Sequence, residues 1–299
     1  MRTAIELRCA AGLVLVAMLL SSIAVAQDDY ASPPPSTGIW GSVYLASGAS
    51  SIDDRLLLSS DYRLLLAGTE FTEEDLSAYR QTNNFWSNNG GSRAVVLGIG
   101  IHPFMNNERK GPELRMGVSY TSVRAGGIGY ERSDRYPLDT LVSSSTGIVF
   151  FVDSIHTSRY DMGHNAERFG LEGSLIFLTS GRSRWSLQGG VGLAFGARAN
   201  ARTWVNKVEE GVVNYPGTSW RNDLIASRNE EVENSGGMWV AFQVPIGVAF
   251  RLSRRSNLLG RMDLYIEGRP GMLVQGTREL GIITSVGSQS LFGLRVRLD

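Results

Sequence analysis

Residues 238–269 read MWVAFQVPIGVAFRLSRRSNLLGRMDLYIEGR and alternate between two kinds of side chain. In the first half, every second residue from Met238 to Leu252 is apolar, whereas the row between them, from Trp239 to Arg251, is mixed. After a polar break the alternation returns, with charged residues on the second row. A period of two is the pattern of a β-strand with one apolar face. The stretch therefore predicts two long amphipathic strands joined by a short turn.

The length of the first apolar row indicates where such a strand would lie. From Val240 to Leu252 it covers about 40 Å at roughly 3.3 Å per residue. At a strand tilt of about 40° this projects to about 30 Å, close to the hydrocarbon thickness of a bilayer. The row is therefore typical of a membrane-spanning β-barrel.

Composition favours an all-β protein and gives no reason to expect nucleic acid as a partner. The chain has 299 residues, of which 35 are glycine, and no stretch shows sustained helical periodicity. Its 29 basic and 29 acidic residues balance, so no excess positive charge is available to attract nucleic acid. The only lysines are Lys110 and Lys207, and this preference for arginine indicates that many cations lie in ion pairs or at interfaces.

The N-terminus predicts export. Arg2 and Arg8 precede an apolar run over residues 10–20, and small residues ending at Ala26 provide a cleavage site. These are the three parts of a secretory signal peptide. No other stretch approaches about 18 consecutive apolar residues, which argues against helical membrane spans.

This reading divides the chain into three parts. We expect a signal peptide at 1–26, an exposed periplasmic tail at 27–36 and an outer-membrane barrel at 37–299. The single cysteine, Cys9, would leave with the signal peptide. The mature chain would then have no disulfide and no cysteine-based metal site, and we expect no cofactor.

Eight segments alternate with period two. They lie at residues 39–45, 94–102, 113–121, 169–177, 185–195, 238–252, 261–269 and 292–298. The connections between them alternate between long and short, and the long ones are predicted as loops near residues 49–91, 126–165, 201–236 and 276–289. Within the second loop, an apolar island at residues 148–152 is consistent with a strand extension beyond the membrane.

This alternation is typical of transmembrane β-barrels, whose periplasmic turns are short and whose external loops are long. An even number of strands also places both termini in the periplasm. The predicted fold is therefore all-β: an eight-stranded antiparallel up-and-down transmembrane barrel with long external loops and short periplasmic turns.

The orientation of the rows has to be argued, because period two does not say which face is inside. The charged rows also contain glycines such as Gly98, Gly117 and Gly190. Small residues beside long ones suit a narrow lumen. Aromatic residues lie toward the ends of the apolar rows, as interfacial girdles do: Tyr120, Trp185, Phe250 and Phe292. A secreted or periplasmic β-sandwich or soluble barrel is the alternative.

Lumen-facing charges are the main candidate site. The predicted charge network consists of Glu113, Arg115, Glu172, Arg251, Arg261, Asp263, Glu267, Arg269, Arg295 and Arg297, accompanied by Gln188 and Gln243. An eight-stranded barrel is just wide enough for its side chains to fill it, and buried charges have to pair. We expect a salt-bridged plug with a structural role, and the alternative is a gated path for small solutes or ions.

The architecture and the terminal strand at residues 292–298 resemble the small eight-stranded outer-membrane proteins of Gram-negative bacteria. This group includes the OmpA transmembrane domain and the OmpW-like and opacity-type barrels. The resemblance covers nearly the whole mature chain and implies location in the outer membrane. Implied partners are outer-membrane lipids, lipopolysaccharide, the barrel assembly machinery and periplasmic chaperones, and the protein is expected to be a monomer.

The resemblance also raises two enzymatic alternatives at the barrel rim. The segment 153–167 contains Asp153, His156, Ser158, Asp161, His164 and Glu167. Omptin-type proteases place His and Asp on the rim, and His156-Thr157-Ser158 resembles the His-x-Ser of lipid A deacylases. However, Arg159 and Tyr160 follow where that family carries Asn and a small residue. Metal capture by His156 and His164 is a further alternative, although we predict no metal site and no catalytic residue.

Arginine and aromatic residues of the predicted loops are candidates for contacts with lipopolysaccharide phosphates or a partner surface. They are Tyr62, Arg202, Trp204, Tyr215, Trp220 and Arg221. The function we predict is non-enzymatic, either structural or surface-interacting. A narrow channel is the second reading and a rim-active hydrolase the third.

Overall fold

The computed structural model describes residues 40–51, 59–82, 92–102, 111–179, 183–214, 221–253 and 258–298. The predicted signal peptide and periplasmic tail lie outside the described residues. None of the helices in the described part of the chain is long and apolar enough to cross a bilayer.

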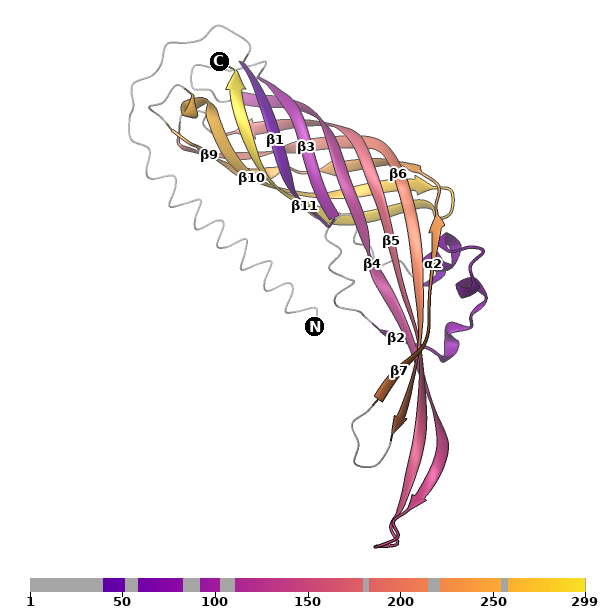
Figure 1. Cartoon of the computed structure of the whole chain (residues 1–299). Coiled ribbons are helices and arrows are strands. Elements are labelled where there is room, and N and C mark those ends of the chain that lie inside the picture. Colours follow the sequence, from indigo (N-terminus) through magenta and orange to yellow (C-terminus); the bar gives the residue numbers. More distant parts are fainter. Residues whose placement is uncertain are drawn as a thin grey trace. The chain divides into compact units, whose positions relative to one another are not determined.

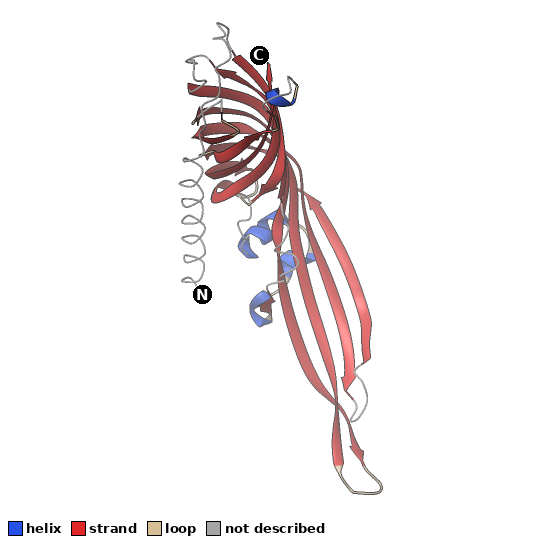
Figure 2. Cartoon of the chain, turned by 90° about the vertical axis from the view of Figure 1, so that its left-hand side faces the viewer, coloured by secondary structure: helices blue, strands red, loops and turns tan. Residues whose placement is uncertain are grey.

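Antiparallel strands close into a ring of eight positions (Figures 1 and 2). Strand β11 returns to pair with β1, so that Val43 lies opposite Val296. The predicted all-β, eight-stranded antiparallel barrel is therefore confirmed. In ring order the members are β1 (Trp40–Ser50), β3 (Ser92–His102), β4 (Gly111–Val142), β5 (Val149–Leu178), β6 (Trp185–Asn214), β8 (Gly237–Gln243) with β9 (Ile246–Arg251), β10 (Met262–Thr277) and β11 (Gly281–Leu298).

Strands β8 and β9 share one position in the ring because Pro245 interrupts the strand predicted at 238–252. A proline has no N–H to donate to the sheet ladder. Both flanks nevertheless pair with β6 and β10, and the amide N–H of Val244 donates to the carbonyl of Pro270 at 2.9 Å. The alternation therefore continues in register across the break.

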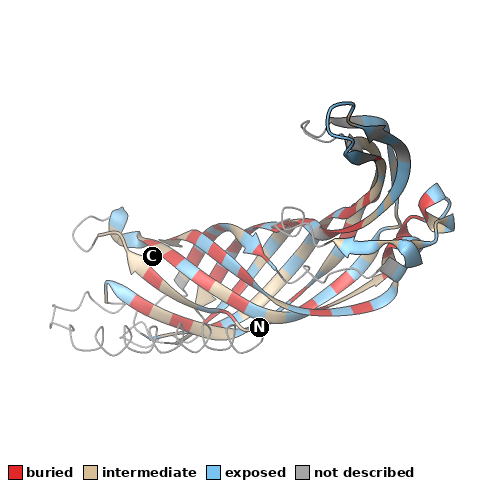
Figure 3. Ribbon diagram, turned by 90° about the horizontal axis from the view of Figure 1, so that it is seen from below, coloured by how far each residue is buried: buried red, intermediate tan, exposed pale blue. Residues whose placement is uncertain are grey.

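Apolar rows face outward and mixed rows face the lumen, as the striping of the strands in Figure 3 shows. On β1, Leu45 is 53% exposed and its neighbour Tyr44 only 1%. On β3, Leu97 is 50% exposed and Val96 is fully buried. A soluble barrel would bury the apolar rows instead, so this orientation contradicts the soluble alternative. The outward rows form an apolar surface suited to lipid hydrocarbon.

Aromatic residues mark both ends of the outward rows. Trp185 and Phe250 are in contact at the end of the barrel that carries the short turns, here called the turn end, with ring centroids 4.6 Å apart. Tyr120 and Phe169 are in contact at the opposite, arm end, at 5.1 Å. Phe292 lies opposite Ser47, toward the arm end of β1.

The predicted loops at 126–165 and 201–236 are instead strands. Beyond the ring, residues 122–142, 149–167 and 199–214 continue β4, β5 and β6 as one sheet (Figure 1). This sheet, here called the arm, is widened by β7 (Arg221–Glu233), which pairs with β6, and by β2 (Arg80–Thr82), which pairs with β4. The loop predicted at 276–289 is also wrong, since only residues 278–280 connect β10 to β11.

Two bulges explain why the alternation of the sequence predicted strands only as far as the rim of the barrel. In β4 the pairing shifts between Ala125 and Ile128, and in β6 it shifts around Asn200, whose φ is 49°. A bulge inserts an unpaired residue, so the parity of the lumen-side face changes. On β4 the residues of this face have odd numbers up to Val123. Beyond the bulge the face includes Tyr130, which has an even number.

A small apolar core holds residues 59–82 against the arm. Within them lie α2 (Ser59–Leu65), η1 (Glu70–Glu73) and η2 (Leu76–Ala78). Their buried side chains pack on the face of the arm that continues the lumen side; the cluster consists of Tyr62, Leu65, Leu66, Phe71, Ile128, Tyr130, Tyr160, Met162 and Val205. This burial gives the long strands a core of their own outside the barrel.

Glu74 adds a polar anchor to this core. Its carboxylate accepts hydrogen bonds from the hydroxyls of Tyr160 and Tyr79, each at 3.0 Å. Burial and the bond to Glu74 raise the pKa of the Tyr160 hydroxyl, so it remains a donor at physiological pH.

The replacement Leu97→Arg tests the outward orientation. An arginine in the middle of the lipid-facing row is expected to destabilise the barrel in a bilayer by about 2–4 kcal/mol. The matched control is Ile282→Arg, at the arm end of β11, where the expected cost is about 0–1 kcal/mol. Urea titration in phospholipid vesicles, with heat-modifiable gel mobility reporting the folded barrel, measures both. Equal, negligible costs for the two variants would contradict the lipid-facing assignment.

Candidate functional site

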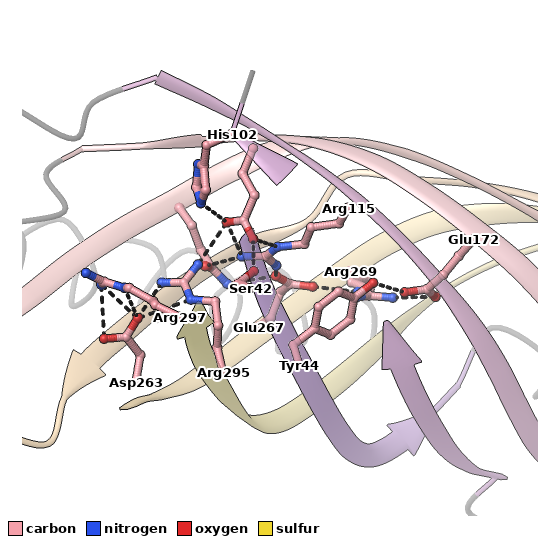
Figure 4. Close-up of polar contacts among 12 residues, drawn as sticks. Ser42, Tyr44, His102, Arg115, Glu172, Asp263, Glu267, Arg269, Arg295 and Arg297 are labelled. Atoms are coloured by element: carbon pink, nitrogen blue, oxygen red, sulfur yellow. Dashed lines mark hydrogen bonds and ion pairs between the residues drawn. The ribbon is translucent and has the colours of Figure 1, made fainter. Parts of the chain in front are cut away.

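Nine of the ten predicted lumen charges meet inside the barrel. Figure 4 shows the polar contacts among most of them. The strands position them because each occupies an inward-facing place in the alternation. Strand β4 provides Glu113 and Arg115, β5 provides Glu172, β9 provides Arg251, β10 provides Asp263, Glu267 and Arg269, and β11 provides Arg295 and Arg297.

Glu267 is the centre of the network. Its carboxylate accepts from Arg115 Nη1 at 2.9 Å, from Arg269 Nε at 2.6 Å and from Gln188 Nε2 at 2.7 Å. Arg269 continues to Glu172 at 2.9 Å. Glu267 is fully buried and each donor comes from a different strand, so this carboxylate ties β4, β6 and β10 together across the lumen.

A second group of ion pairs lies closer to the turn end. Asp263 accepts from Arg295 Nη2 at 3.0 Å and from Arg297 Nη2 at 2.8 Å. Arg251 lies farther away, with Nε 3.9 Å from an Asp263 oxygen. Arg295 Nη1 also donates to Glu113 at 2.9 Å, and Arg115 Nη2 reaches Glu113 at 3.4 Å. Glu113 therefore joins the two groups into one network.

The network is nearly neutral. Five guanidiniums face four carboxylates, a difference of one positive charge; they are Arg115, Arg251, Arg269, Arg295 and Arg297 against Glu113, Glu172, Asp263 and Glu267. Isolated charges at such depth would be very costly, and mutual pairing offsets that cost. The arrangement fills the lumen with fixed, mutually compensated charge.

Aromatic rings and glycines complete the packing around Arg115. Its guanidinium carbon lies 5.6 Å from the ring centroid of Tyr44 and 5.7 Å from that of Tyr265. A Cβ at Gly98 would lie 2.5 Å from Tyr44 Cζ, and one at Gly293 would lie 2.5 Å from Tyr265 Cζ. The glycines therefore make the room that these rings occupy.

The position of Arg261 differs from the predicted lumen position. It lies in η3 (Leu259–Arg261) and its side chain is exposed, because β10 begins one residue later, at Met262. Arg261 has the parity of the inward-facing residues of β10, but it lies just before the first residue of that strand. Conversely, Ser42 joins the network by donating to Glu113 at 2.9 Å. The parity of the first predicted strand was the available signal for Ser42.

A small polar cavity lies on the arm side of the network. Its volume is about 20 Å³, enough for one water molecule. The Ser50 hydroxyl and the side-chain Oε1 of Gln289 are both buried and have no hydrogen-bond partner among the described residues. The lining consists of Ser50, Ser119, Thr121, Arg168, Glu172, Ala194, Trp239, Ala241, Gln243, Leu273 and Gln289. Gln243, predicted to accompany the charges, thus lines this cavity.

A chain of hydrogen bonds closes the arm end of the barrel. Arg198 contacts His164 Nε2, and His164 Nδ1 lies 2.7 Å from the Thr203 hydroxyl. Thr203 donates to Asn234 Oδ1 at 2.5 Å, and Asn234 Nδ2 donates to the Leu65 carbonyl at 2.7 Å. A neutral His164 with its proton on Nδ1 fits these contacts: Nε2 accepts from Arg198, and Nδ1 donates to the Thr203 hydroxyl. The chain links β5 and β6 to residues 59–82.

The segment 153–167 does not assemble a catalytic group. It belongs to β5, so His156 and Ser158 lie on one face and Asp153 and Asp161 on the other. Asp153 accepts from Arg135 Nε at 2.7 Å, and Asp161 pairs with Arg159 at 3.0 Å. The two acids are therefore engaged by arginines away from the histidine.

The two histidines do not meet either. His156 and His164 lie eight residues apart on the same strand, about 26 Å at roughly 3.3 Å per residue. One metal ion does not bridge that distance. The remaining acid of the segment, Glu167, accepts from Tyr120 at 3.2 Å and from Asn200 at 2.8 Å.

Of the residues proposed for surface contacts, Tyr62 is fully buried in the core of the arm. Arg202 is exposed and pairs with Glu231 at 3.4 Å and Glu233 at 3.2 Å. The ring of Trp204 covers Gly163. Tyr215 and Trp220 lie outside the described residues.

The replacement Glu267→Ala is expected to destabilise the folded barrel by about 3–5 kcal/mol, because Arg115 and Arg269 would lose a buried partner. The control is Glu231→Ala in the exposed pair with Arg202, for which we expect less than about 1 kcal/mol. Urea titration in vesicles gives both values. A cost for Glu267→Ala no larger than that of the control would show that the lumen is hydrated enough to screen its charges.

His164 is expected to make the arm sensitive to acid. Burial, reinforced by the Arg198 guanidinium, lowers its pKa from 6.5 to about 3. Between these values the unfolded segment binds the proton and the folded one does not, so stability present above pH 6.5 is lost as the pH falls toward 3. We expect the amide protection factors of residues 59–82, which correct for the slower intrinsic exchange in acid, to fall between pH 7 and pH 4.

The control for this acid effect is His164→Gln, which keeps a polar side chain without a titrating ring. The protection factors of this variant are expected to change less over the same pH interval, since only the carboxylates that both proteins contain still titrate. Identical pH profiles for the two proteins would assign the effect to those carboxylates and not to His164.

Comparison with known proteins gives limited similarity. No protein-family model matches the sequence, and no curated protein matches it. Two solved structures to which the chain shows similarity are Ail, the attachment invasion locus protein of Yersinia pestis, in complex with the heparin analogue sucrose octasulfate, and Neisserial surface protein A. Ail is 10% identical, with 87% of this chain and 99% of Ail covered and a TM-score of 0.25.

Neisserial surface protein A is 12% identical, with 86% of this chain and 96% of that protein covered and a TM-score of 0.25. At such scores neither similarity bears on the function of this chain. Its own ring of strands and outward apolar rows have the architecture of a small eight-stranded outer-membrane β-barrel.

Proposed function

We propose that this protein is a non-enzymatic outer-membrane β-barrel with a closed lumen, which acts through the sheet that it carries beyond the membrane. The observation that supports this most directly is the compensated charge network. Arg115, Glu267 and Arg295 lie in the lumen, where an open channel would leave them accessible to water, yet they are at most 2% exposed. A lumen filled in this way offers no continuous path to a solute.

The outward rows support the location. A surface of leucine, valine and phenylalanine around the whole ring would be unfavourable in water but matches hydrocarbon. Long extensions of such barrels face the outside of the cell and short turns face the periplasm, so the arm is assigned to the cell exterior. Lipopolysaccharide and outer-membrane lipids would surround the ring, and the assembly machinery and periplasmic chaperones would deliver a monomer.

The arm supplies the surface role. Strands of 30 to 32 residues are far longer than a membrane crossing needs. They are held by a dedicated core around Phe71 and Tyr160, so the arm is an ordered surface. A rigid sheet held above the membrane suits the binding of a partner.

Conductance across planar bilayers tests the closed lumen. The wild-type protein is expected to show no steady openings, because every lumen charge is held by a partner. The balanced variant Arg115→Ala/Glu267→Ala removes two opposite charges from the centre of the plug, and we expect it to admit small ions. The matched control Arg202→Ala/Glu231→Ala removes an exposed pair on the arm and is expected to stay closed.

Two results would overturn the proposal. Stable wild-type openings that disappear when lumen residues are enlarged would establish the channel alternative. Release of fatty acid from lipid A, or cleavage of a peptide, that stops in His156→Ala and Ser158→Ala would establish the hydrolase.

A further inference from the structure

The far end of the β4–β5 hairpin carries no charge, and exposed apolar side chains flank its Ser-Ser-Ser-Thr-Gly turn at residues 143–147. Thirteen consecutive residues, 140–152, lack any acidic or basic side chain, although charged residues are frequent in the strands below. Val142 is 63% exposed, Ile148 53% and Val149 48%. This segment, here called the tip, therefore presents an uncharged turn flanked by exposed apolar side chains at the end of the arm.

The tip is apolar on both faces. Val142 pairs with Val149, and the exposed Ile148, which is next to Val149 in the chain, lies on the opposite face of the ribbon. Strand β6 pairs with β5 only as far as Asp153, so among the described strands the tip consists of β4 and β5 alone. A sheet that docks on a protein needs one apolar face, whereas a ribbon apolar on both faces matches a hydrocarbon environment that surrounds it.

Polar and aromatic groups follow immediately below the tip. Tyr136 and His156 lie edge to face with centroids 6.2 Å apart, and Arg135 pairs with Asp153. Tyrosine and charged groups beside an apolar segment are typical of the headgroup level of a membrane. The order from an uncharged end with exposed apolar side chains to a polar girdle is therefore that of a segment that enters a lipid interface.

The arm is long enough to reach a surface other than its own membrane. Val142 lies 22 residues beyond Tyr120 on β4, about 70 Å along the strand at roughly 3.3 Å per residue. Tyr120 marks the arm end of the outward rows. The tip is thus carried far from the hydrocarbon that surrounds the barrel.

We propose that the tip binds the lipid interface of a second bilayer that faces the cell surface. This inference rests on the surface role proposed above and names its partner as a phospholipid membrane. Insertion is shallow, because both edges of the ribbon carry backbone groups that need water or headgroup partners. Apolar burial rather than charge drives binding, so zwitterionic lipid suffices and salt has little effect.

Vesicle co-flotation tests the proposal with the full chain in nanodiscs and phosphatidylcholine vesicles. The wild-type protein is expected to float with the vesicles. Ile148→Asp/Val149→Asp is expected to weaken binding at least about tenfold, since carboxylates replace two apolar side chains that would enter the lipid on binding. The control Leu224→Asp/Ile225→Asp makes the same changes at exposed positions of β7 and is expected to bind like wild type. Heat-modifiable mobility confirms that each variant folds.

A fluorescent label tests the depth of insertion. In a Cys9→Ser background, Ile148→Cys provides a single thiol for an environment-sensitive dye. We expect a blue shift with vesicles and quenching by lipids brominated near the headgroup end of their chains. A label at Leu224→Cys is expected to show neither.

Several outcomes would overturn the lipid partner. These are wild-type protein that ignores vesicles, binding unchanged in Ile148→Asp/Val149→Asp, and equal loss in the β7 control. Loaded nanodiscs that associate with each other but not with empty nanodiscs of the same lipid, and that separate when the tip is changed, would assign the tip to a second copy of the chain. Conductance of the same proteins reports the closed lumen separately, so its failure is distinguishable from failure of this inference.

Discussion

Mutual neutralisation of buried charge inside the barrel is the constraint on which the rest of the structure depends. Turning the apolar rows toward hydrocarbon leaves arginines and carboxylates no place except the lumen. There each isolated charge would be prohibitively costly. Glu267 solves this by accepting from Arg115 and Arg269 at once, and Glu113 connects that centre to Arg295. The same contacts cross-link distant strands of the ring and remove the path that a pore would require.

The closed lumen and the arm are two consequences of one continuous sheet. Strands β4, β5 and β6 do not end at the membrane but continue, with their lumen-side face covered by residues 59–82. Where the barrel interior uses ion pairs, the arm uses an apolar core around Phe71, Tyr160 and Met162. The change of chemistry is physical in origin: the arm has water on its other face, so it can bury apolar side chains as a soluble sheet does.

The ring and most of its lumen were predictable because they depend on alternation within each strand. Nine of the ten charges that parity assigned to the lumen lie there, whereas Arg261 lies one residue before its strand begins, because a strand boundary is harder to predict than a strand. The arm was not predictable in this way. The bulges near Ala125 and Asn200 change the parity, so an ordered strand reads as an irregular loop. The pairing of residues 59–82 with the arm joins segments far apart in the chain.

The sequence by itself determined the strand count and the composition of each row, since these properties repeat with the period of a single strand. Only the tertiary structure decided which carboxylate meets which guanidinium, that His164 joins Arg198 and Thr203 at the barrel mouth, and that the long connections are themselves sheet. These features depend on register between strands and on burial by distant segments. A local pattern carries no information about either, because the energies involved arise only when the ring has closed.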